Sequence, residues 1–179
     1  MLHVIEINKY RPSLMRRGRY LSEDWGSCSD ISKTYNGIIL TREEYLRVEA
    51  SYISAVRAVC SLANVPGLCA HKVEHWDVNS ETLRRNNLDD VIDGTPAPAD
   101  GEPIAGPRID NAFRRCLREV GWLEFVVPKS FVIHFGYDYR VLIGLAQDPS
   151  PLEGLMRDLG LFMYKITSTL STFEEWGFA

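Results

Sequence analysis

The sequence lacks a long apolar run, a Cys-x-x-Cys pair and a glycine-rich phosphate loop. A membrane helix needs about 18 consecutive apolar residues, and the longest apolar stretches here, near 131–135 and 159–164, are only strand-sized. The N-terminus shows no positively charged segment followed by an apolar one, so no secretion signal is predicted. The four cysteines are scattered, and the chain is long enough to bury a core without disulfides. We therefore expect reduced thiols in a cytoplasmic protein.

The composition is that of one soluble folded domain spanning residues 1–179. Of these residues 45% are hydrophobic and 25% are charged, with a formal net charge of −4. An acidic chain is poorly suited to bind nucleic acid, because phosphate contacts need basic residues. The segment 77–102 is the most acidic part, with seven acidic residues, two arginines and a net charge of −5. It is predicted either to meet a basic protein partner or to form a solvated loop.

Two principal helices are predicted from apolar residues that recur at three- and four-residue steps. The first spans 41–64, where Thr41 and Glu44 form a capping-box pattern. The second runs from 108 to about 120, and a shorter helix is predicted over 80–92. Four polar residues of the second helix are expected to face solvent: Arg114, Arg115, Arg118 and Glu119.

Patterns of period two predict a mainly antiparallel sheet. Short turns favour a meander of the three strands that follow the second helix. With both principal helices on one face of the sheet, the predicted fold class is α+β. Residues 93–107 hold four prolines and three glycines, and are predicted to form a mobile loop without regular structure. The expected strands are 3–7, 68–78 (leading into a polar loop), 122–127, 131–135, 139–145 and 161–166.

Residues 71–75 read His-Lys-Val-Glu-His, the pattern of inverted zinc metallopeptidases. That chemistry needs a helix, which places the two histidines on one face and lets the glutamate activate water. Here Pro66 precedes the pattern, and a strand is expected instead. On a strand His71 and His75 lie roughly 13 Å apart, too far to share one metal. A metal-dependent enzyme using His71, Glu74 and His75 is therefore the lesser alternative.

His134 and Asp138 form the second constellation that could carry chemistry. A histidine and an aspartate can act as a general base and its orienting group, so a small hydrolytic enzyme is also an alternative. The sequence offers no evident nucleophile beside them. Alternating aromatic and polar residues on a hairpin more often form cross-strand pairs that hold a sheet together. We predict no catalytic residues, no bound cofactor and no metal site.

Five strings are spread from the N-terminus to about residue 145: 5–12 (IEINKYRP), 23–31 (EDWGSCSDI), 40–49 (LTREEYLRVE), 115–123 (RCLREVGWL) and 134–139 (HFGYDY). Together they resemble a bacterial family of immunity proteins from polymorphic-toxin and contact-dependent growth inhibition systems. The resemblance implies a non-enzymatic protein that binds a cognate toxin domain and neutralises it. Many such toxins are nucleases with basic surfaces, and an acidic inhibitor associates with a basic surface at a high rate.

The acidic segment 77–102 is the predicted docking surface for such a toxin. Recognition concentrates on loops carried by a rigid scaffold, because loops can vary without disturbing the core. The alternative is that these acids only keep a loop soluble. The residues predicted to bind the partner are Asp89, Asp90, Asp93, Asp100 and Glu102.

Overall fold

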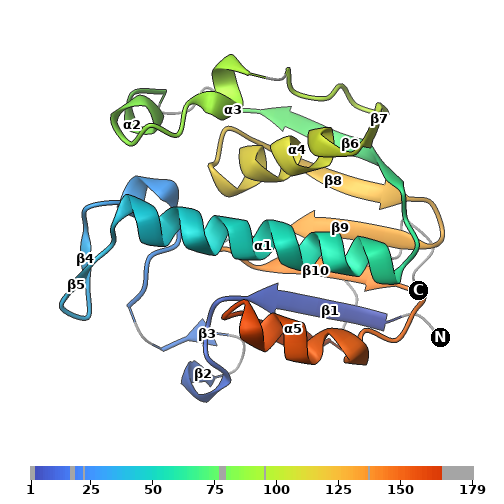
Figure 1. The fold of residues 1–179 in the computed structure, drawn as a ribbon, viewed down its shortest axis with the longest axis horizontal. Helices are drawn as coiled ribbons and strands as arrows, with labels where there is room; N and C mark the ends of the chain where they lie inside the picture. The colour runs from blue at the N-terminus through green and yellow to red at the C-terminus, as the bar shows by residue number, and fades with distance from the viewer. Residues whose placement is uncertain are drawn as a thin grey trace.

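The computed structural model describes residues 3–16, 19–21, 23–76, 80–94, 96–136 and 138–166. Its centre is a seven-stranded sheet with the strand order β11-β1-β10-β9-β8-β6-β7, in which all neighbours are antiparallel (Figure 1). The strands are β1 (His3–Asn8), β6 (Gly67–His75), β7 (Pro103–Ala105), β8 (Gly121–Val127), β9 (Phe131–Phe135), β10 (Val141–Leu145) and β11 (Phe162–Lys165). The α+β class is thereby confirmed, and each predicted strand is present. The strand predicted over 139–145 begins only at Val141, because Asp138 and Tyr139 form the turn before it.

Two helices, α1 (Arg42–Leu62) and α4 (Pro107–Leu117), lie side by side on one face of the sheet. Between them and the sheet lies the main core, which includes Phe131, Ile133 and Phe135 of β9 and Tyr52 of α1. Alternate residues of a strand point to opposite faces, and Val132 accordingly belongs to a second, small apolar cluster on the other face. The strand β9 thus presents Phe131, Ile133 and Phe135 to the main core.

Helix α1 begins at a threonine cap, as the sequence predicts. The Thr41 hydroxyl accepts a hydrogen bond from the Glu44 backbone N–H at 3.1 Å. The Glu44 carboxylate does not complete the capping box, because it pairs with the Arg47 guanidinium at 2.7 Å. Buried residues then follow at helical spacing along α1, and β6 begins five residues after its end.

The smaller elements lie around this core. They are the 3-10 helices η1 (Pro12–Leu14), η2 (Cys28–Asp30) and η3 (Ser150–Leu152), the strands β2 (Met15–Arg16), β3 (Arg19–Tyr20), β4 (Thr34–Tyr35) and β5 (Ile38–Ile39), and the helices α2 (Ser80–Arg85), α3 (Asp90–Asp93) and α5 (Glu153–Asp158). The helix predicted over 80–92 is therefore two short helices, separated by a turn in which Asn87 has φ +52°. No described helix is both long and apolar enough to cross a membrane.

The proline-rich segment 93–107 carries regular structure, contrary to the prediction. Residues 103–105 form β7, which pairs with the start of β6 at the edge of the sheet. Ahead of β7, the Ala70 N–H donates to the Glu102 carbonyl at 2.9 Å, and the Gly101 N–H donates to the Ala70 carbonyl at 2.8 Å. Proline is tolerated in an edge strand, where a missing N–H need not interrupt the ladder. Pairing with the open edge of β6 therefore outweighs the preference of a proline- and glycine-rich segment for irregular structure.

The polar face of α4 is not the solvated surface that its sequence suggests. Arg118 is only 3% exposed, and its guanidinium pairs with both carboxylate oxygens of Glu49 on α1 at 2.7 and 2.8 Å. It also donates to the Leu88 carbonyl at 2.7 Å and to Asp90 at 2.5 Å. Burial lowers the pKa of Arg118, but Glu49 and Asp90 more than offset this and hold it above its ordinary value. The prediction for Arg118 was wrong because residues 80–93 pack over this face.

Two neighbouring arginines serve the same contact. Arg115 donates to the Val91 carbonyl at 2.5 Å, and Arg42 of α1 donates to the Asn86 carbonyl at 2.7 Å. Backbone carbonyls at the ends of short helices lack partners within the helix. These arginines supply the missing donors, and thereby fix the segment 80–93 against α1 and α4.

Candidate binding cleft

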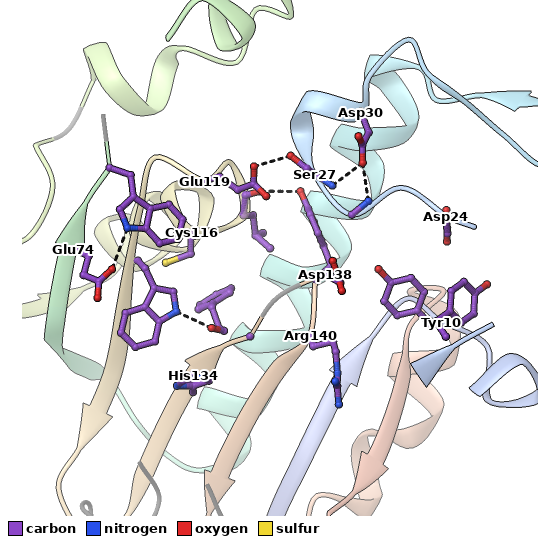
Figure 2. A pocket seen from close by; sticks show the side chains of 18 of the residues that line it. Tyr10, Asp24, Ser27, Asp30, Glu74, Cys116, Glu119, His134, Asp138 and Arg140 are labelled. Atoms are coloured by element: carbon purple, nitrogen blue, oxygen red, sulfur yellow. Dashed lines mark hydrogen bonds between the residues drawn. The ribbon is translucent and has the colours of Figure 1, made fainter. Parts of the chain in front are cut away.

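A cleft of about 1180 Å³ opens at one end of the sheet. There β1, β6 and β9 end and β8 and β10 begin, and the loop 23–30 forms the opposite wall (Figures 1 and 2). Aromatic rings and charged groups share the lining. Its acidic residues are Glu23, Asp24, Asp30, Glu74, Glu119 and Asp138.

The wall made by residues 23–30 owes its shape to Asp30. The Asp30 carboxylate accepts hydrogen bonds from the Gly26 and Ser27 backbone N–H groups at 2.9 and 3.2 Å, and Lys33 pairs with it at 2.8 Å. Ser27 caps the 3-10 helix η2 in return. Burial raises the pKa of Asp30, but the Lys33 and Gly26 contacts outweigh it and lower the value overall. Asp30 is therefore ionised at neutral pH, and its negative charge is offset by Lys33.

The buried cation Lys9 contacts two lining residues of the cleft, Asp24 and Tyr10. The Lys9 ammonium pairs with Asp24 at 2.7 Å, and lies 4.1 and 4.5 Å from the ring centres of Trp25 and Tyr10. Its side chain is only 6% exposed. Burial lowers the pKa of Lys9, and the contact with Asp24 opposes that shift. The charge of Asp24 is thus offset within the chain.

Two carboxylates of the cleft stand on residues with left-handed backbones. Glu119 (φ +56°) follows the end of α4, and Asp138 (φ +56°) lies in the turn between β9 and β10. The Ser27 hydroxyl donates to Glu119 at 2.7 Å. A Cβ added to Gly26 would lie 3.2 Å from the Asp138 Oδ1, so the glycine allows the loop to approach this carboxylate. Figure 2 shows the hydrogen bond between Ser27 and Glu119.

The described lining holds one arginine, Arg140, and its charge is also offset within the chain. Its guanidinium pairs with both carboxylate oxygens of Glu6 at 2.8 and 2.5 Å. Glu74 and Glu119, by contrast, accept hydrogen bonds from neutral donors, the Trp76 indole and the Ser27 hydroxyl. Among the described lining residues, acidic side chains thus outnumber basic ones after the internal pairs are counted.

Two tryptophans form the other half of the cleft. The Trp122 indole donates to the Phe135 carbonyl at 2.7 Å, and its ring meets the His134 ring edge-on at 5.2 Å between centroids. Trp76 is 41% exposed. Cys116 lies nearby, and burial raises the pKa of its thiol to about 12, so at neutral pH it is a thiol and not a nucleophilic thiolate.

His134 lines the cleft, but its partner is not the predicted Asp138. The His134 Nδ1 lies 3.1 Å from the carboxylate of Glu124, a fully buried residue of β8. Lys72 approaches the other oxygen of that carboxylate at 3.5 Å. The register of the β8–β9 hairpin places Glu124 directly opposite His134, so the short turn at 128–130 was the signal that could have revealed this pair.

The His-x-x-Glu-His pattern lies on β6, as the expected strand requires. His71 is opposite Glu124 and His75 is opposite Gly121, with a bulge between His71 and Glu74. Glu74 lines the cleft, but His71 and His75 do not. The residues that the structure describes contain no group of three or more His, Cys, Asp or Glu side chains placed to hold a metal ion.

Four of the five acids predicted to bind a partner do not line the cleft, namely Asp89, Asp90, Asp100 and Glu102. Asp90 pairs with Arg118, and Glu102 pairs with Arg108 at 2.7 Å. Asp100 accepts a hydrogen bond from the Val73 N–H at 3.3 Å. Asp89 precedes α3 without capping it, and the side chain of Asp93 lies outside the described part of the chain. Two of these charges are thus offset by intramolecular ion pairs.

Sequence reasoning considered Glu74 and Asp138 only as parts of two separate catalytic patterns. It did not group the six acids that line the cleft, because they come from four separate stretches between residues 23 and 138. Only the close spacing of Glu23, Asp24 and Asp30 gave a local signal. Comparison of the chain with protein-family models, curated proteins and solved structures gave no match. The site is therefore interpreted from its own geometry: an open, aromatic and negatively charged cleft.

Proposed function

We propose that this protein is a non-enzymatic, cytoplasmic immunity protein that binds and neutralises a cognate toxin domain through the cleft at the end of the sheet. The observation that carries the proposal is the excess of acidic over basic side chains among the described residues that line a large, open, aromatic cleft. Such a surface complements a basic protein segment, and it speeds association by attracting the partner over a distance. A nuclease domain is the toxin class that fits best, because a phosphate-binding surface is basic.

Aromatic residues strengthen the case for a protein partner. Tyrosine, tryptophan and arginine are enriched at the centres of protein interfaces, and arginine stacks on aromatic rings while it pairs with carboxylates. Lys9, held between Asp24 and the rings of Trp25 and Tyr10, shows the same chemistry within the chain. A basic side chain of the toxin would find similar groups in the cleft.

The test begins with the gene beside this one, which under the proposal encodes a secreted protein with a variable C-terminal toxin domain. That domain is expressed alone, and its association is measured by surface plasmon resonance. We expect Glu74→Gln, Glu119→Gln and Asp138→Asn together to lower the association rate about ten-fold at low salt and to flatten its salt dependence.

The matched control removes three carboxylates away from the cleft, by Asp148→Asn, Glu153→Gln and Asp158→Asn, all on exposed residues. These changes alter the net charge equally. At 0.15 M salt they should leave the association rate within about two-fold, whereas the cleft variant should still slow association, because screening at that salt concentration weakens charges that lie farther than about 8 Å from the contact. Equal effects of the two triple variants would reject the cleft as the docking surface.

A small hydrolytic enzyme remains the second candidate, and the Glu124–His134 pair favours it. A buried carboxylate beside one ring nitrogen orients an imidazole as it does in general bases. Stoichiometry separates the two functions. An inhibitor protects only when it equals or exceeds the toxin, and His134→Gln, which retains a polar partner for Glu124, should still protect. Protection by trace amounts that His134→Gln abolishes would identify an enzyme.

A further inference from the structure

We propose that the β4–β5 hairpin (residues 34–39) is a second contact for the same protein partner, so that the interface joins an apolar prong to the acidic cleft. This inference rests on the proposed function. It adds an apolar contact that the charge of the cleft does not supply, and it defines the partner as a protein with a basic protrusion beside an apolar pocket.

Two adjacent isoleucines on the hairpin are left largely in solvent. Ile38 is 73% exposed and Ile39 is 58% exposed. Neighbouring residues of a strand point to opposite faces, so both faces of β5 present an isoleucine. Neither side chain is part of the core. A protruding hairpin that carries an isoleucine on each face can seat an apolar side chain in a pocket of a partner protein.

The hairpin is held in one conformation. Asn36 (φ +50°) and Gly37 (φ +80°) form its two-residue tip with the left-handed backbones that tight hairpins require. The Asn36 side-chain amide donates to the Glu23 carbonyl at 2.8 Å, and Lys33 at the base pairs with Asp30 at 2.8 Å. A prong that is already ordered loses little conformational entropy when it binds.

The hairpin lies at the same end of the molecule as the cleft (Figure 1). Its two anchors, Glu23 and Asp30, both line the cleft. Two further exposed apolar side chains belong to this end: Trp76, in the lining itself, and Leu21, next to the lining residue Tyr20. A protein that fills the cleft is therefore placed to contact the prong.

A second copy of this chain is a poorer occupant. Each copy carries a net charge of −4 and the same acidic cleft, so two copies that meet at this end repel each other. A basic toxin domain has the opposite charge. Charge complementarity thus favours the toxin as the one partner of both the cleft and the hairpin.

The two contacts act on different rate constants, which makes them separable. Charges steer the encounter and raise the association rate, whereas an isoleucine seated in an apolar pocket slows dissociation. We expect Ile38→Ser with Ile39→Ser to raise the dissociation rate of the isolated toxin domain about ten-fold or more. The association rate and its salt dependence should stay within about two-fold of the unaltered protein.

The matched control is Ile92→Ser with Leu155→Ser, two residues exposed by 37% and 39% on other parts of the surface. It should leave both rate constants unchanged. Circular dichroism and thermal unfolding of both double variants confirm that the fold is retained, which is expected because none of the four side chains is buried.

Each outcome decides the matter. An unchanged dissociation rate in the hairpin variant, beside a slowed association of the cleft variant, overturns the prong and leaves the proposed function standing. An equal rise of the dissociation rate in the control variant would show that replacing any exposed apolar side chain has this effect. That result would also overturn the hairpin contact. Self-association of the free protein in sedimentation, abolished by the hairpin variant, would assign the prong to a second copy instead. If the unaltered chain forms no complex with the toxin domain, both the proposed function and this inference are rejected.

Discussion

At the residue scale, two of the cleft carboxylates stand on residues whose backbone conformation is one that glycine adopts most easily. Glu119 and Asp138 both have φ +56°, a conformation that costs a residue with a side chain roughly 1–2 kcal/mol. Glycine is the common residue after a helix end such as that of α4. The chain places a charged side chain there instead, and both side chains line the cleft. Such a cost at a surface position is typical of a functional site.

Arg118 gives the sharpest stability prediction at this scale. Its guanidinium is the buried partner of Glu49, which is itself only 3% exposed. Arg118→Met removes the two short contacts to that carboxylate and leaves it buried with only Arg114, at 3.5 Å, so we expect the free energy of unfolding to fall by about 3 kcal/mol. Urea denaturation followed by circular dichroism measures the change.

Two controls bound this interpretation. Arg47→Ala removes an arginine that is 57% exposed and pairs with Glu44 on the surface, and it should cost about 0.5 kcal/mol or less. Glu49→Leu combined with Arg118→Met removes both buried charges, and should recover a large part of the loss. A small effect of Arg118→Met alone would mean that water or other donors solvate Glu49.

At the element scale, the strands and helices that the sequence predicts are those whose apolar pattern is uninterrupted. Phe131, Ile133 and Phe135 alternate without a break, and the β8–β9 turn fixes their register against β8. Phe135 packs against Phe113 and Phe125 at centroid distances of 5.7 and 5.8 Å. Local spacing was sufficient here, because the hydrophobic face of a strand is set by its period.

Phe135→Ala tests that packing. The side chain is 7% exposed and lies in the main core, so its truncation should lower the free energy of unfolding by about 3–5 kcal/mol. Chemical denaturation with linear extrapolation gives the value. A loss below about 1 kcal/mol would show that β9 presents its other face to the helices.

Elements that depend on distant partners could not be predicted in this way. Strand β7 forms because it pairs with the edge of β6. The sequence of residues 93–107 does not indicate that such an edge lies beside it. Arg118 was assigned to solvent because the packing of residues 80–93 over α4 is a tertiary contact. Both predictions were wrong for the same reason: the local sequence is polar or proline-rich, and a partner segment distant in sequence determines the structure.

At the scale of the whole molecule, the cleft depends on strand order. The sheet inserts β1 between β10 and β11, which brings Tyr10 and the loop 23–30 to the end where β9 and β10 meet. Sequence patterns predict which segments are strands, but the order of strands is a long-range property. The acids of the cleft therefore could not be grouped from the sequence. The acids of 77–102 could be grouped, because they lie in one segment of the chain.

Screening by salt offers a whole-molecule test of which acidic surface meets the toxin. The Debye length is about 30 Å at 0.01 M salt and about 8 Å at 0.15 M. Asp89 lies outside the cleft lining, and Asp93 is the last residue of α3. We therefore expect these two charges to act on a partner seated in the cleft only through the long-range electrostatic field. Asp89→Asn with Asp93→Asn should slow association at 0.01 M salt and leave it unchanged at 0.15 M, whereas the cleft triple variant should slow association at both. Stopped-flow measurement with the isolated toxin domain gives these rates. If the Asp89 and Asp93 changes slow association at 0.15 M as much as the cleft variant does, the toxin docks on the segment 77–102 instead.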